Sequence, residues 1–174
     1  MAITLNGSGG VTGLTALPDS AMASGSILQV VNTQTGAMST GTTQIPNDDT
    51  IPQITEGFEV MTRTITPSST TNKLLINVVT HISASSDSIP TTALFVDSTA
   101  DALACTFSHA FGLGNYPKVH NLNHYMTAGS TSELTFRVRV GFNGSGTLTF
   151  NGRSGSRRRG GVAASSITIM EIAA

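Results

Sequence analysis

The sequence divides sharply into an opening of small, nearly chargeless residues and a longer part in which apolar and polar residues alternate. Residues 1–26 contain one charged side chain, Asp19, and are interrupted by Asn6-Gly7, Gly9-Gly10, Gly13 and Pro18-Asp19. Turn residues at this spacing exclude a regular helix, and so few large apolar side chains cannot build a core. We therefore expect residues 1–26 to form an extended arm that a partner orders, and residues 27–174 to form the folded head.

Alternation with a period of two is the dominant pattern of the head and predicts β-strands. Its clearest stretches are residues 73–83 and 133–142, each with one apolar and one polar face. Further strands are predicted over residues 27–31, 58–66, 92–96, 103–108, 119–126, 147–150 and 165–172. No helix of normal length is predicted. The fold class is therefore all-β, an antiparallel β-sandwich of jelly-roll type.

One short turn signal bears on how these strands are connected. Asn143-Gly144 lies between the strand that ends at Phe142 and the strand that begins at Thr147. Asn-Gly is a strong hairpin signal when alternating strands flank it. It predicts that these two strands lie side by side and antiparallel.

The composition favours an oligomer. Charged residues make up 11% of the chain and aromatic residues 5%, with no tryptophan, so the core must come from Val, Ile, Leu and seven Phe. Such a core is small for a monomer of 174 residues. Residues 1–62 carry five acidic and no basic residues, whereas all nine Lys and Arg lie at or after Arg63. This distribution suits contacts between oppositely charged parts of neighbouring chains.

Several classes of protein are excluded or disfavoured. The single cysteine, Cys105, permits neither an intrachain disulfide nor a cysteine-based zinc site. No stretch approaches the roughly 18 apolar residues of a membrane span, so no membrane partner is expected. Ser, His and acidic residues are present, but there is no G-x-S-x-G motif, and the acids lie mostly in predicted turns. We expect no enzymatic activity, no catalytic residues and no cofactor.

His120 and His124 are the strongest candidates for metal ligands. On a strand, residues four apart point to the same face about 13 Å from each other, which is too far for one ion. We interpret them as histidines of a polar face; the alternative is an oligomer axis that brings copies of one histidine together. Asp97 and Asp101 lack the dense acidic spacing of a calcium loop. No metal site is expected.

Three loop segments are candidates for contact with a partner. They are the turn at residues 97–101, the glycine-containing residues 111–116, and residues 153–159 within the Gly/Ser-rich stretch 151–161. The glycines of residues 111–116 precede no helix and so form no phosphate cradle. The arginines of the last segment suit phosphate or acidic glycans, but the slightly negative chain has no interleaved aromatic residues, so no nucleic-acid partner is expected. Solvated charges or salt bridges between chains are the alternative. The candidate contact residues are Asp97, Asp101, Phe111, Asn115, Tyr116, Arg153, Arg157, Arg158 and Arg159.

Several phrases resemble tail-fibre-like proteins of bacteriophages. They are AITLNGSGGVTGL at residues 2–14, GSILQVV at residues 25–31, ITPSSTTNKLLI at residues 65–76 and SITIMEI at residues 166–172. The resemblance spans nearly the whole chain. It implies a homotrimeric β-sandwich virion protein in which three arms run together and three heads form a knob.

On this resemblance the chain is expected to be a non-enzymatic phage fibre or spike at the virion surface. Residues 1–26 would anchor it to other virion proteins, and loops of the head would contact a glycan or protein of the host surface through many weak copies. The chain lacks a repeated shaft and coiled-coil heptads. A trimeric capsid cement or head-decoration protein, with the arm threaded between shell subunits, is therefore the alternative, and the position on tail or capsid stays open.

Overall fold

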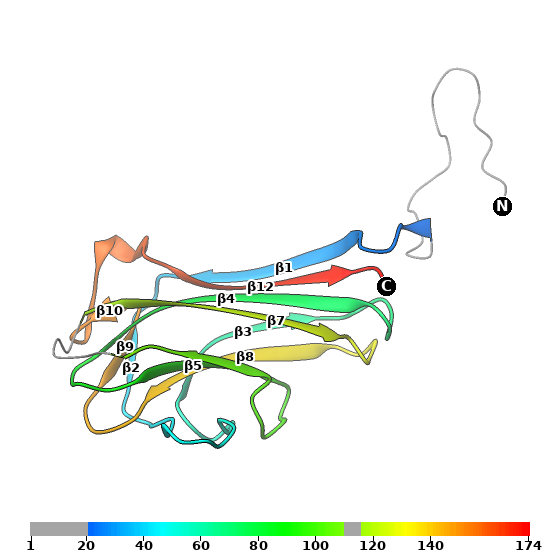
Figure 1. The fold of residues 1–174 in the computed structure, drawn as a ribbon. Coiled ribbons are helices and arrows are strands. Elements are labelled where there is room, and N and C mark those ends of the chain that lie inside the picture. Colours follow the sequence, from blue (N-terminus) through cyan, green and yellow to red (C-terminus); the bar gives the residue numbers. More distant parts are fainter. Residues whose placement is uncertain (1–20, 110–115) are drawn as a thin grey trace.

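Two antiparallel sheets face each other in the head, as Figure 1 shows. The computed structural model describes residues 21–109 and 116–174. The first sheet has the order β1 (Ile27–Thr35), β12 (Ser165–Ile172), β4 (Lys73–Ala84), β9 (Leu148–Phe150) and β2 (Ser39–Gly41), and β7 (Lys118–Thr127) pairs with the other edge of β4. The second has the order β3 (Phe58–Ile65), β8 (Leu134–Phe142), β5 (Pro90–Val96) and β6 (Ala104–Phe107). The predicted all-β, jelly-roll-like sandwich is confirmed.

Three short elements lie between the last two strands of the first sheet. β10 (Gly152–Arg153) and β11 (Ser156–Arg157) pair as a small hairpin, and a 3-10 turn, η2 (Arg159–Gly161), follows. They are too short for a periodic signal and were not predicted. In Figure 1 they lie at the end of the sandwich opposite the chain's C-terminus.

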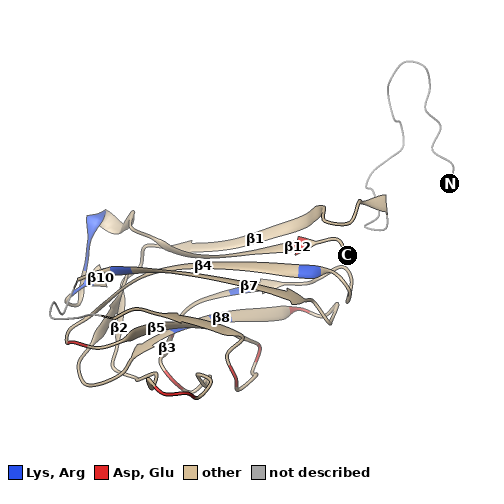
Figure 2. Cartoon of the chain, in the orientation of Figure 1, with Lys and Arg blue, Asp and Glu red and all other residues tan. Residues whose placement is uncertain are grey.

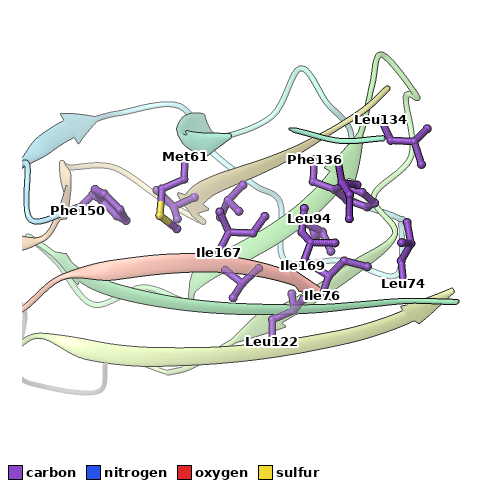
Figure 3. Close-up of a cluster of buried hydrophobic side chains, with 14 of the residues drawn as sticks. Met61, Leu74, Ile76, Leu94, Leu122, Leu134, Phe136, Phe150, Ile167 and Ile169 are labelled. Atoms are coloured by element: carbon purple, nitrogen blue, oxygen red, sulfur yellow. The ribbon is translucent and has the colours of Figure 1, made fainter. Parts of the chain in front are cut away.

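The core explains why the alternating stretches fold as strands. On β4, the apolar residues of the inward face are 0–1% exposed; they are Leu74, Ile76, Val78 and Ile82. On β8, the apolar face is 0–9% exposed and consists of Leu134, Phe136, Val138, Val140 and Phe142. These faces meet between the sheets, as the labelled side chains in Figure 3 show. Each large apolar side chain buried in this way contributes about 1.5–3 kcal/mol, which fixes the register of both strands.

The predicted hairpin at Asn143-Gly144 is wrong. β8 pairs with β3 and β5 in the second sheet, whereas β9 pairs with β2 and β4 in the first. Residues 143–147 therefore cross from one sheet to the other. Asn143 Oδ1 accepts a hydrogen bond from the Ile89 amide at 2.6 Å, and the Ser86 hydroxyl donates to the Ser145 carbonyl at 2.7 Å. These contacts with the β4–β5 connection hold the turn as a corner of the sandwich, so Asn-Gly here marks a change of sheet.

The predicted division into arm and head is only partly within the described residues. Residues 1–20 lie outside them, so the arm stays a prediction. At the start of the head, the Gly25 amide donates to the Ala173 carbonyl and the Ala173 amide donates to the Ser26 carbonyl, both at 2.9 Å. The first residues of the described chain are therefore fastened to its last ones. Among the described residues, no helix is long and apolar enough to cross a membrane.

Candidate functional site

The outward face of the first sheet carries an apolar row that crosses four strands. Leu75 on β4 lies opposite both Met170 on β12 and Tyr125 on β7, and Met170 lies opposite Val30 on β1. Residues opposite each other on neighbouring strands point to the same face. Their neighbours along the strands, such as Ile76 and Ile169, are buried in the core, so these four point outward. We call Val30, Met170, Leu75 and Tyr125 the apolar row.

The rest of this face is polar but almost free of charge. The next row consists of Asn32, Thr168, Asn77 and Asn123. Within it, Asn32 Nδ2 donates to Thr168 Oγ1 at 2.8 Å. Lys73, at the edge of the face, donates from Nζ to Thr127 Oγ1 at 2.7 Å. Figure 2 accordingly shows β1, β12, β4 and β7 mostly in tan.

Large apolar side chains are exposed on this face. Tyr125 is 57% exposed, Val30 54% and Val119 53%, and Ile27 lies at the end of the face opposite Ile172. Single exposed apolar residues are ordinary, but an apolar set arranged in one row with few charges around it is typical of a contact surface.

A buried carboxylate fastens β1 beneath the apolar row. Glu171 on β12 is 0% exposed, and its Oε1 accepts hydrogen bonds from Asn72 Nδ2 at 2.7 Å and from the Ser68 amide and hydroxyl at 2.8 Å each. Its Oε2 accepts one from Gln29 Nε2 on β1. Burial raises the pKa of Glu171, but the bonds from Asn72, Gln29 and Ser68 outweigh it and leave this pKa below its usual value. No pattern in the sequence indicated this cluster.

The prediction that His120 lies on a polar face is wrong. This histidine is 4% exposed, points between the sheets, and its Nδ1 and Nε2 contact Thr92 Oγ1 at 3.0 Å and Ser108 Oγ at 2.9 Å. Thr92 in turn shares a 2.8 Å hydrogen bond with Thr80. Two hydroxyl partners satisfy the neutral ring, which is why a histidine fits this interior position. Burial lowers the pKa of His120 to about 4.

The arrangement around His120 is a poor catalytic dyad. A serine nucleophile needs a histidine that accepts its proton near neutral pH and a third group that stabilises the resulting charge. Here a threonine hydroxyl replaces the usual carboxylate, and the lowered pKa makes the imidazole a weak base. Among the described residues, no group of three or more His, Cys, Asp and Glu side chains could hold a metal ion.

The acidic contact candidates have structural partners. Asp97 adopts a positive φ of 53°, and its Oδ1 accepts the Thr135 amide at 2.8 Å. Asp101 Oδ1 accepts Gln53 Nε2 at 2.9 Å. Both carboxylates therefore stabilise the turns that contain them. Phe111 and Asn115 lie outside the described residues.

The basic contact candidates lie around a cavity near β10, at the end of the sandwich opposite the C-terminus (Figure 1). Its volume is about 580 Å³, and its lining comprises His81, Pro117, Asn151, Gly152, Arg153, Arg158, Arg159 and Ala163. Arg157 is exposed nearby on β11, and the Arg153 guanidinium lies 4.8 Å from the centre of the Tyr116 ring. Figure 2 shows these basic segments beside η2 and the acidic segments in the opposite loops. The structure thus brings together the arginines but not the two acids.

Comparison with solved structures finds β-sandwich proteins of low similarity. A tumour necrosis factor of S. frugiperda, Eiger, is 12% identical with a TM-score of 0.47 over 83% of this chain and 93% of that one. A CBM36 domain of a multidomain xylanase from the hindgut metagenome of Trinervitermes trinervoides is 11% identical. Its TM-score is 0.42, and the match covers 81% of this chain and 96% of that one. A structure from infectious bursal disease virus is 12% identical. Its TM-score is 0.40, and the match covers 86% of this chain and 39% of that one. No curated protein sequence matches the chain.

A family model identifies the chain more directly. The model of the Pgp3 C-terminal domain matches residues 42–174, which contain every strand from β3 to β12. Pgp3 is a Chlamydia protein and not a phage virion component. The expected phage fibre or spike, the capsid-decoration alternative and the virion location are therefore wrong, and virion partners and a host glycan lose their support. The phrases behind that resemblance consist of strand and turn residues that many β-sandwiches share. The chain belongs to the Pgp3 C-terminal domain family.

Proposed function

We propose that the chain is a non-enzymatic assembly module that forms a homotrimer through the outward face of β1, β12, β4 and β7. The observation that supports this most strongly is the apolar row, which runs in register across all four strands. A face with exposed apolar side chains and few charges can be buried without leaving unpaired ions. The small core and the low charge of the chain favour the same conclusion.

The position of the apolar row favours a ring over a two-fold pair. Val30 lies on β1 and Tyr125 on β7, at opposite sides of the face, so each copy offers two different apolar edges. In a ring, the β7 side of one copy contacts the β1 side of the next. Such head-to-tail contacts form a closed ring when the rotations between successive copies add up to a full turn. A trimer is the smallest such ring.

Two features support a function without catalysis. The Ser108–His120 pair lacks a carboxylate partner and has a weakly basic imidazole. The carboxylate of Glu171 is occupied by hydrogen bonds from three residues. Neither group is available for acid–base chemistry at neutral pH.

Light scattering of the purified full chain after size-exclusion chromatography measures the assembly directly. We expect a mass three times the 17.9 kDa of one chain, and dissociation on dilution towards the dissociation constant. A monomer at every concentration would contradict the proposal, as would a dimer.

Substitution of Tyr125 by lysine tests the face itself. Y125K places an ammonium group in the row and removes an aromatic side chain, so we expect the dissociation constant to rise by at least about 100-fold, or about 3 kcal/mol. The matched control is I51K, because Ile51 is 54% exposed in a loop outside this sheet. Sedimentation measurements that found equal dissociation for Y125K and I51K would exclude this face as the interface.

A further inference from the structure

We propose that the cavity lined by Arg153, Arg158 and Arg159 binds a compact ligand that carries two or more phosphate or sulfate groups. The cavity is about 580 Å³ in volume, large enough for such a small molecule. Its lining comes from β4, β10 and η2, and Figure 1 shows β10 at the end of the sandwich opposite the C-terminus. His81 brings the cavity to one end of the outward face of β4, away from the apolar row.

The charge of the lining points to an anion. Three guanidinium groups share one cavity, and its lining contains no acidic residue. Among the described residues, the one salt bridge is Arg137–Glu59, in the second sheet, so no acid within the described part of the chain neutralises these arginines. Like charges gathered around a cavity repel each other, and a bound anion removes this cost. Guanidinium groups bind the oxygens of phosphate and sulfate with paired hydrogen bonds.

The backbone beneath the cavity is held in an uncommon conformation. Asn151, Ser154 and Arg159 have positive φ values of 52°, 50° and 55°, which cost energy for residues other than glycine. Asn151 is 3% exposed; its Nδ2 donates to the Thr35 and Ala37 carbonyls, and its Oδ1 accepts the Ser165 hydroxyl at 2.6 Å. This buried side chain fixes the start of the arginine segment, so the lining is built on a rigid base.

Arg153 is also held in place by an aromatic ring. The guanidinium of Arg153 lies 4.8 Å from the centre of the Tyr116 ring, a cation–π contact that limits its freedom while leaving its N–H groups available. An arginine held in this way loses less entropy when it binds an anion than a free one does. Arg158 and Arg159, which are exposed, supply the other donors.

The cavity lies some distance along the sheet from the apolar row. His81, which lines the cavity, is six residues along β4 from Leu75 in the row. Six residues of strand correspond to about 20 Å. Ligand binding and assembly therefore involve different residues of this face, and both can be measured in the same protein.

Calorimetric titration of the full chain with pyrophosphate tests the proposal, and a disulfated disaccharide serves as the sulfate probe. We expect saturable binding with one site per chain that weakens as salt is added. Binding of either probe supports the proposal, and the tighter one identifies the ester class. The double variant R158Q/R159Q should lose at least about tenfold in affinity, whereas R137Q, which removes a charge from the second sheet, should not. R158K/R159K, which keeps the charge but not the planar donor geometry, should weaken binding several-fold.

Three results would overturn the assignment. The first is the absence of saturable binding by both probes to a chain whose circular dichroism shows it folded. The second is equal affinity in the wild type and in R158Q/R159Q, or undiminished affinity in R158K/R159K. The third is dissociation of the assembly in R158Q/R159Q without any probe binding to the wild type, because the arginines would then form salt bridges between chains.

Discussion

Replacement of Glu171 by alanine is expected to lower the free energy of unfolding by about 3–4 kcal/mol. The change removes the acceptor for Asn72, Gln29 and Ser68 in a site that is 0% exposed. Donors left unsatisfied in the interior cost about 1–3 kcal/mol each, although neighbouring costs do not add fully. Urea unfolding at a fixed chain concentration measures this loss. On heating, it corresponds to a midpoint roughly 6–16 °C lower.

Two variants distinguish the buried carboxylate from a general effect of lost charge. E171Q keeps the shape of the side chain but turns an amide donor towards other donors. Its free energy of unfolding should therefore lie between those of the wild type and E171A. E59A removes a carboxylate whose ion pair with Arg137 has side chains 35–36% exposed, and such pairs contribute less than about 1 kcal/mol. If E171A and E59A were equally destabilised, the cluster around Glu171 would not hold β1 in place.

The expected loss also bears on assembly. Gln29 is on β1 next to Val30, the residue with which β1 contributes to the apolar row. The bond from Gln29 to Glu171 therefore holds one side of the proposed interface. We expect E171A to dissociate at higher concentrations than the wild type, whereas Y125K should dissociate without a comparable loss in the stability of the single chain.

Much of the fold could be predicted because local pattern and burial agree. β4 and β8 each place one face in the core, so buried and partly exposed residues alternate until the last three residues of each strand. The predicted strands at residues 27–31, 58–66 and 165–172 are also confirmed. The hairpin at Asn143-Gly144 failed because turn chemistry does not say to which sheet the next strand belongs; contacts with Ser86 and Ile89 decide that.

Most of the candidate site could not be predicted, because its partners are distant in sequence. Glu171 and Gln29 are 142 residues apart, and His120 is 28 residues from Thr92. A single sequence does not reveal that two hydroxyls make an interior position acceptable for a histidine. The arginines at residues 153–159 were recognised from composition alone, but the cavity depends on His81 from another strand. The predicted contact role of the loop residues stays a prediction.

Acidification is expected to destabilise the fold through His120. Because burial lowers the pKa of His120 from 6.5 to about 4, the unfolded chain binds more protons than the folded chain between these values. The stability that the neutral ring contributes is therefore complete above pH 6.5 and declines as the pH falls towards 4. The decline amounts to about 3 kcal/mol. Glu171, with a lowered pKa, acts in the same direction, but only below its ordinary value of 4.5.

Unfolding by urea at several pH values between about 5 and 7 isolates the histidine, because the carboxylate of Glu171 contributes little there. The wild type should lose stability steadily over this range, whereas H120Q, which cannot titrate, should start lower and lose much less. H124Q measures how much His124 contributes to the loss of stability at low pH, because burial also lowers the pKa of His124. Since the ring of His120 joins β7 to Thr92 on β5 and to Ser108 beyond β6, its protonation should loosen the edge that carries Tyr125. A wild-type profile that stayed flat, or matched that of H120Q, would show that the ring is not buried in its neutral form.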